Sequence, residues 1–98
     1  MLERDYQPTV IARLKEILPG CVVLKNDSGY IQGIPDLSFF FEDKWGMLEV
    51  KPNIFAKYQP NQEWYLDHLN QMSYANMICP ENEEEIYLEI QRTFRPTR

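Results

Sequence analysis

The sequence is poor in the residues that build zinc sites and disulfide frameworks. Its 98 residues include one histidine, His68, and two cysteines, Cys21 and Cys79, which lie far apart and have no CxxC partner. We therefore expect no zinc site of these residue types, and two free, buried thiols. No apolar run approaches the roughly 20 residues that span a bilayer. The polar start MLERDYQP is unlike a signal peptide, so we expect a cytoplasmic protein with no membrane partner.

Positive charge is also scarce. Ten lysines and arginines stand against fifteen aspartates and glutamates, and the formal net charge is −5. Nucleic-acid-binding proteins usually present a basic face, which this balance does not suggest. The charge is unevenly distributed, however, because five acids fall within residues 81–89 and the end, RTFRPTR, has three arginines and no acid. The net value therefore does not describe any one surface.

The length and the apolar content indicate one folded domain covering residues 1–98. Hydrophobic residues make up 44% of the chain and aromatic residues 13%, which is typical of a folded core and not of disorder. A core of this size is modest, so a dimer would bury additional surface.

Hydrophobic periodicity predicts three helices. Their expected ranges are Glu3 to Leu18, Pro60 to about Met72, and a last helix that begins after Asn82. Because proline is favoured in a first turn, Pro8 predicts that the regular part of the first helix begins only near Gln7. Asn82 and Glu85 have the spacing of a capping box.

Four short runs of β-branched and aromatic residues predict strands. They are Cys21–Lys25, Leu37–Phe41, Met47–Lys51 and Tyr74–Cys79, and the middle two are joined by a tight connection within residues 42–46. The first three strands are expected to form a meander, and the fourth, which follows a crossover helix, to pair in parallel. The fold class is therefore α/β, a small mixed sheet flanked by helices in the order α-β-β-β-α-β-α.

Three charged residues interrupt the apolar hairpin: Asp36, Glu49 and Lys51. Charged side chains avoid core strands unless they are paired, hydrated or bound to metal. Because side chains alternate along a strand, Glu49 and Lys51 share a face, and Asp36 joins them if either Asp36 or Ser38 lies opposite Glu49. Two carboxylates at this point would suit Mg²⁺ or Mn²⁺. A plain salt bridge between Lys51 and one carboxylate is the alternative.

Five short motifs extend this pattern along the chain. In order they are Glu3 with Gln7, Asn26 with Gly29, Gly33-Ile34-Pro35-Asp36, Glu49-Val50-Lys51, and Gln62 near Pro60. Together they resemble the PD-(D/E)XK nuclease superfamily and, within it, the VRR-NUC (virus-type replication-repair nuclease) domain. The resemblance covers residues 3 to about 79.

The resemblance implies a restriction-endonuclease-like fold and a metal-dependent nuclease that hydrolyses DNA. Asp36, Glu49 and the carbonyl of Val50 would hold Mg²⁺ or Mn²⁺, and Lys51 would be the catalytic lysine. Gln62 would orient Lys51 or contact the scissile phosphate, and Glu3 would support the metal through water.

Stand-alone members of this branch are viral or bacterial, resemble Holliday-junction resolvases and work as homodimers. The resemblance therefore implies a homodimer that acts on branched DNA in DNA repair, in a bacterial or phage-infected cell. We expect Lys25, Lys57, Gln7 and Asn26 to contact the nucleic acid. Two alternatives stay open. One is a non-cleaving module that binds branched DNA, or binds a protein through its acidic last helix; the other is an exonuclease or flap nuclease.

Overall fold

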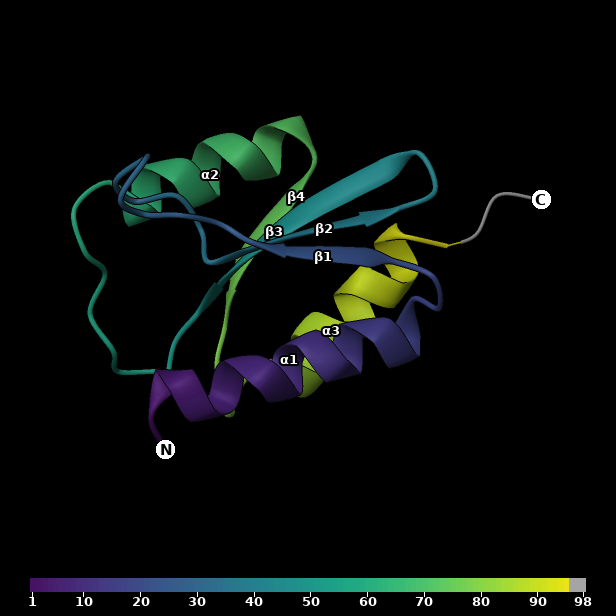
Figure 1. The fold of residues 1–98 in the computed structure, drawn as a ribbon, viewed down its shortest axis with the longest axis horizontal. Helices are drawn as coiled ribbons and strands as arrows, with labels where there is room; N and C mark the ends of the chain where they lie inside the picture. The colour runs from purple at the N-terminus through teal and green to yellow at the C-terminus, as the bar shows by residue number, and fades with distance from the viewer. Residues whose placement is uncertain (96–98) are drawn as a thin grey trace.

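The computed structural model describes residues 1–95, and within them the predicted element order is confirmed (Figure 1). The helices and strands are α1 (Glu3–Ile17), β1 (Val22–Lys25), β2 (Leu37–Phe41), β3 (Lys44–Val50), α2 (Gln62–Met72), β4 (Tyr74–Ile78) and α3 (Glu83–Thr93). None of the helices in this part of the chain is long and apolar enough to cross a membrane.

The strands form one mixed sheet in the order β1-β2-β3-β4. β1, β2 and β3 are an antiparallel meander, and β4 lies parallel to β3 after the α2 crossover, as predicted. Helices α1 and α3 pack together on one face of the sheet, and α2 lies over β3 and β4 on the other (Figure 1). On the face of the sheet where α2 lies, β1 and β2 are therefore not covered by a helix.

The main core lies between the sheet and the pair α1 and α3. Leu37, Phe39, Leu48 and Val50 alternate toward this side and are fully buried, and each such side chain stabilises the fold by about 1.5–3 kcal/mol. Gly46 lies opposite Phe39, and a Cβ at this glycine would come within 2.5 Å of the Phe39 ring. The strand therefore needs glycine here to admit the ring.

The hairpin between β2 and β3 is tighter than predicted. Phe41 pairs with Lys44, so the turn is only Glu42 and Asp43, and β3 begins three residues before the expected Met47. Glu42 takes a left-handed conformation with φ of 56°. The expectation was wrong because it took Gly46 as a turn residue, whereas this glycine sits inside the strand beneath Phe39.

Both helix starts marked by proline differ from the prediction. α1 begins at Glu3 and contains Pro8, so the regular helix begins four residues before the predicted Gln7. Pro8 removes the N–H that would reach the Arg4 carbonyl, and both residues are exposed, so water can satisfy that carbonyl. α2 begins at Gln62 and not at Pro60, because Asn61 adopts the left-handed conformation with φ of 72°.

The predicted capping box is wrong. Asn82 is the N-cap residue of α3, but its side chain makes no bond to the helix. Its amide instead accepts a hydrogen bond from the Cys79 N–H at 2.8 Å and donates one to the Met77 carbonyl at 3.0 Å. Asn82 therefore ties the helix start back to the end of β4, whose backbone groups would otherwise lack partners. Cys21 and Cys79 are free and buried, as expected.

Candidate metal centre

The register of the β2–β3 hairpin brings Asp36 and Glu49 together. Leu37 pairs with Leu48 and Ser38 with Met47, which places Asp36 opposite Glu49 and excludes the alternative with Ser38 in that position. Asp36 comes just before β2, where its Oδ2 accepts a hydrogen bond from the Val50 N–H at 2.7 Å. This bond holds the Asp36 carboxylate at the edge of β3.

Glu49, Lys51 and Gln62 form a closed set of contacts at the same end of the sheet. Lys51 Nζ lies 3.2 Å from Glu49 Oε2 and donates to Gln62 Oε1 at 2.9 Å. Gln62 Nε2 donates to Glu49 Oε2 at 2.9 Å. The salt bridge considered as the alternative to a metal site is therefore present, and the first residue of α2 joins it. Gln62 is itself fixed by the Gln59 N–H, which donates to Gln62 Oε1 at 2.7 Å.

One oxygen of this set has no partner. Glu49 is 1% exposed, and its Oε1 is the one buried side-chain oxygen or nitrogen within residues 1–95 that lacks a hydrogen bond. Leaving a buried carboxylate oxygen unsatisfied is costly, because the group has lost its water and gained nothing in return. Unsatisfied buried polar groups are rare in native proteins, and each calls for an explanation such as an ordered water, an ion or a catalytic role.

The cluster holds more ionisable carboxyl groups than cations. Burial, followed by the nearby Asp36, raises the pKa of Glu49 to about 8, although Lys51 acts in the opposite direction. Burial also raises the pKa of Asp36, against the lowering effects of the Val50 N–H, the Glu49 carboxyl and Lys51. One lysine therefore does not keep both buried carboxyl groups ionised at neutral pH.

Glu3 belongs to the same electrostatic cluster although it lies at the start of α1. Burial and the charge of Asp36 raise the pKa of Glu3, and Lys51 lowers it. The charge of Glu3 in turn contributes to the raised pKa of Glu49. The fold thus gathers Glu3, Asp36, Glu49, Lys51 and Gln62 from four separate segments.

The donors at this point suit a hard divalent cation. Asp36 and Glu49 offer carboxylate oxygens, and Glu49 Oε1 is unoccupied by any protein donor. N–H and C=O of one strand residue point the same way, so the Val50 carbonyl faces the side on which its N–H meets Asp36. No group of three or more His, Cys, Asp and Glu side chains arranged for a metal occurs in the described part of the chain. A set of two carboxylates and a carbonyl needs no third such side chain, because Mg²⁺ keeps several waters.

Asn26 has a positioning role that the sequence did not suggest. Its Nδ2 donates to the Pro35 carbonyl at 2.8 Å, its Oδ1 accepts from the Ser38 hydroxyl at 2.9 Å, and its N–H donates to the Asp36 carbonyl at 2.8 Å. These bonds fix the backbone on both sides of Asp36. The predicted contact of Asn26 with nucleic acid stays a prediction, but its side chain is already engaged within the protein.

Gly33 brings the segment before Asp36 against the start of α2. It has φ of +93°, and a Cβ there would lie 2.6 Å from the Asn61 Cβ and 2.9 Å from the Pro60 carbonyl oxygen. Only glycine allows this approach of the two backbones. The contact joins the chain segments that carry Asp36 and Gln62.

Of the other three predicted nucleic-acid contacts, Gln7 and Lys57 lie on segments that carry site residues, whereas Lys25 shares the face of Leu37, which is opposite to that of Asp36. Gln7 is half-buried one turn after Glu3 in α1. Lys25 is exposed at the end of β1, where it pairs with Leu37, the residue after Asp36. Lys57 is exposed in the segment that connects Lys51 to Gln62.

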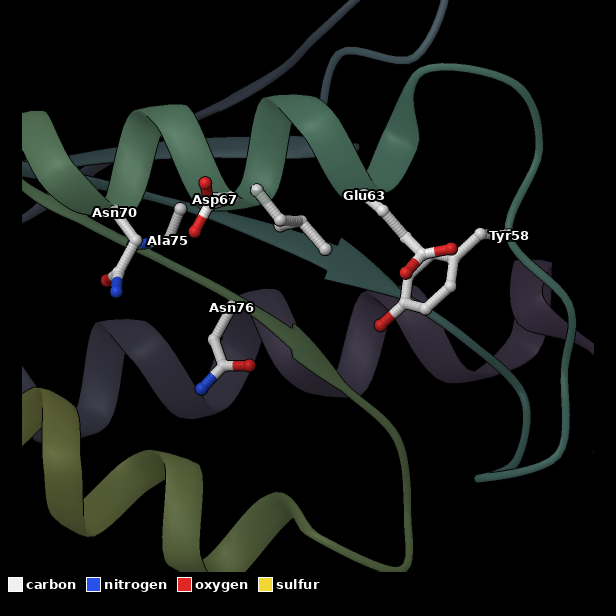
Figure 2. A pocket seen from close by; sticks show the side chains of 7 residues that line it. Tyr58, Glu63, Asp67, Asn70, Ala75 and Asn76 are labelled. Carbon is white, nitrogen blue, oxygen red and sulfur yellow. The ribbon is translucent and has the colours of Figure 1, made fainter.

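Tyr58 links the site to a neighbouring cleft. Lys51 Nζ lies 5.6 Å from the centre of the Tyr58 ring, a cation–π contact. Tyr58 also lines a polar cleft of about 300 Å³ between α2 and β4, together with Glu63 (Figure 2). Asp67, Asn70 and Asn76 line the rest of this cleft. No sequence spacing indicates the contact between Tyr58 and Lys51, because it depends on how the connecting segment folds back.

Comparison of the chain with protein-family models, with curated proteins and with solved structures found no match.

Proposed function

We propose that the protein is a Mg²⁺-dependent nuclease that hydrolyses DNA phosphodiester bonds, with a preference for branched DNA and a restriction-endonuclease-like fold. The observation that carries the proposal is the buried Glu49 oxygen without a partner, in a cluster with more carboxylates than cations. A divalent cation would satisfy that oxygen and replace the proton that Glu49 holds at neutral pH because of its raised pKa. The ordered motifs shared with PD-(D/E)XK and VRR-NUC nucleases support the same assignment.

Asp36, Glu49 and the Val50 carbonyl would hold the metal. Bound there, Mg²⁺ or Mn²⁺ would supply positive charge beside the scissile phosphate and lower the pKa of a coordinated water. Glu3, half-buried at the start of α1, would hold such water through its carboxylate.

Lys51 is the group that acts on the phosphate or on the attacking water. It is 6% exposed, so its charge is poorly screened by solvent and acts strongly over short distances. Gln62 holds the Lys51 ammonium at 2.9 Å from its Oε1 and, through its Nε2, fixes the Glu49 carboxylate. Tyr58 covers the ammonium from another side. These contacts hold the lysine in place before substrate arrives, which lowers the entropy cost of reaching the reactive geometry.

A homodimer is part of the proposal, and the uncovered sheet face supports it. Val22, Leu24 and Phe40 share this face and are 55%, 51% and 41% exposed. Paired cuts across a branched junction require two sites, which a twofold axis supplies. Light scattering should give the mass of a dimer for the wild type and of a monomer for Leu24→Glu.

A non-cleaving module is the second candidate, favoured by the acidic start of α3. Glu83, Glu84 and Glu85 lie in its first turn, and Glu84 pairs with Arg13 of α1 at 3.2 Å while remaining exposed. Such a surface repels DNA and fits a basic partner protein.

Cleavage assays on a panel of substrates distinguish the candidates. Labelled duplex, fork, flap and four-way junction DNA should be incubated with Mg²⁺, Mn²⁺ or EDTA, using wild type, Asp36→Asn and Asp43→Asn. Asp43 lies in the exposed hairpin turn at the far end of the same strands and serves as a matched control. The proposal expects metal-dependent products that Asp36→Asn loses and Asp43→Asn keeps. Products from free ends alone would identify an exonuclease, and the absence of any product from folded protein would favour the binding module.

A further inference from the structure

The segment 52–61 is a loop whose two ends are joined at the candidate site. It leaves β3 after Lys51 and enters α2 at Gln62 (Figure 1), and the side chains of these two residues are hydrogen-bonded at 2.9 Å. We call residues 52–61 the site loop. The ends of the site loop therefore lie at the cluster of Asp36, Glu49 and Lys51.

The site loop presents an aromatic ring to solvent. Phe55 is 87% exposed and its neighbour Ile54 is 43% exposed. The backbone beneath them is held by specific bonds. The Phe55 N–H donates to the Asn53 side chain at 2.9 Å, and the Ile54 N–H donates to Glu81 Oε1 at 3.1 Å. The Phe55 ring is therefore accessible to a ligand from solvent.

Other residues of the site loop also fit a nucleic-acid strand. Lys57 is exposed two residues away, and Tyr58 lies over the Lys51 ammonium. Aromatic rings on which bases stack, combined with cations that contact the backbone, are the usual means of binding single-stranded nucleic acid. Bases in a paired duplex are already stacked, so an exposed ring selects a base that is unpaired.

We propose that the site loop binds an unpaired nucleobase of the DNA substrate by stacking on Phe55, with Lys57 contacting the adjacent phosphate. This inference rests on the proposed function and deepens it, because it names the element that distinguishes branched DNA from duplex.

Binding without cleavage tests the inference separately from catalysis. The probes are a forked duplex with unpaired bases at the branch and a fully paired duplex of the same length, each labelled for fluorescence anisotropy, with Ca²⁺ in place of Mg²⁺. The variants are Phe55→Leu, which keeps an apolar side chain, and Phe55→Trp, which keeps a stacking ring. Leu88→Ala, at a 51% exposed position in α3, is the control. A 2-aminopurine base at the branch reports stacking directly through quenching of its fluorescence.

Phe55→Leu is expected to bind the fork about tenfold more weakly than wild type and to bind the paired duplex unchanged. The 2-aminopurine quenching should be lost in Phe55→Leu and kept in Phe55→Trp and Leu88→Ala. Equal binding of the fork by wild type and Phe55→Leu, or an equal loss on both DNAs, would overturn the inference. Wild-type protein that binds neither DNA would also overturn it and would point to a protein partner for Phe55. Wild-type protein that binds the fork through Phe55 but cleaves nothing would refute the proposed nuclease and leave the inference standing.

Discussion

Binding of Mg²⁺ should depend steeply on pH, because the metal must displace a proton from Glu49. Burial and the nearby Asp36 raise the pKa of Glu49 to about 8. The metal binds the ionised carboxylate, so its apparent affinity should rise about tenfold per pH unit below pH 8, which corresponds to about 1.4 kcal/mol per unit. Above pH 8 the carboxylate is already ionised and the affinity should level off.

In the metal-free protein, the contribution of Glu49 to folding stability falls as pH rises, whereas the affinity for Mg²⁺ rises. Because the folded-state pKa of Glu49 is raised, the folded protein holds a proton that the unfolded chain releases. The contribution of this group to stability is therefore full below about pH 4, near the carboxyl pKa of the unfolded chain, and is lost as pH rises toward 8. Mg²⁺ reverses this trend, so the increase in melting temperature caused by Mg²⁺ should grow between pH 6 and pH 8.

Isothermal titration calorimetry at pH 7 in two buffers of different ionisation enthalpy counts the protons released per metal bound. About one proton should be released by the wild type and far less by Glu49→Gln. Glu85→Gln, at an exposed position on α3, should match the wild type. An Mg²⁺ affinity that does not change between pH 6 and pH 8, or no proton release, would refute the assignment of Glu49 as a metal ligand.

Three further substitutions test how the site is positioned and the core is packed. Asn26→Ala should lower the unfolding free energy by about 1–3 kcal/mol, since two polar partners lose their bonds, and calorimetry should also show weaker Mg²⁺ binding. Gly33→Ala should be more destabilising than Gly20→Ala in urea unfolding, because both glycines have positive φ but only a Cβ at Gly33 meets another backbone segment. We expect the unfolding free energy to fall by roughly 3 kcal/mol or more for Gly33→Ala and by roughly 1–2 kcal/mol for Gly20→Ala. Equal losses would contradict the close approach of the two backbones at Gly33. Phe39→Ala should cost about 3–5 kcal/mol in the same assay, and a loss below 1 kcal/mol would be inconsistent with its buried position.

The element order and the approach of Asp36 to Glu49 and Lys51 could be predicted from sequence because they follow from local patterns, whereas Glu3 and Gln62 were predicted only through the resemblance to a nuclease family. Alternation along the two hairpin strands puts Glu49 and Lys51 on one face, and an even-numbered turn puts Asp36 beside them. The sequence was compatible with two registers of the hairpin, because no local residue pattern fixes the position of the turn between the strands. In the structure Asp36 lies opposite Glu49, and this register places Gly46 opposite Phe39, where only glycine leaves room for the ring.

Contacts between distant segments could not be predicted in this way. Asn26 is a polar residue in a turn-like stretch of sequence. This pattern is as typical of a residue that binds a ligand as of one that positions the backbone. Its bonds to Pro35 and Ser38 depend on how β1 and β2 pair. Asn82 and Glu85 have the spacing of a capping box, but the end of β4 offers Asn82 better partners. In each case tertiary structure supplied a bond that outweighed the local pattern.

Cleavage of a labelled four-way junction beside matched linear duplex, by the wild type, Lys51→Ala and Lys15→Ala, tests the central claim most directly. Lys15 is an exposed lysine in the last turn of α1, at the opposite end of that helix from Glu3, and controls for the loss of a positive charge. The account predicts paired nicks in the junction that require Mg²⁺ or Mn²⁺, disappear in Lys51→Ala and persist in Lys15→Ala. Folded wild-type protein that leaves every substrate intact in both metals, or equal cleavage by Lys51→Ala, would contradict it.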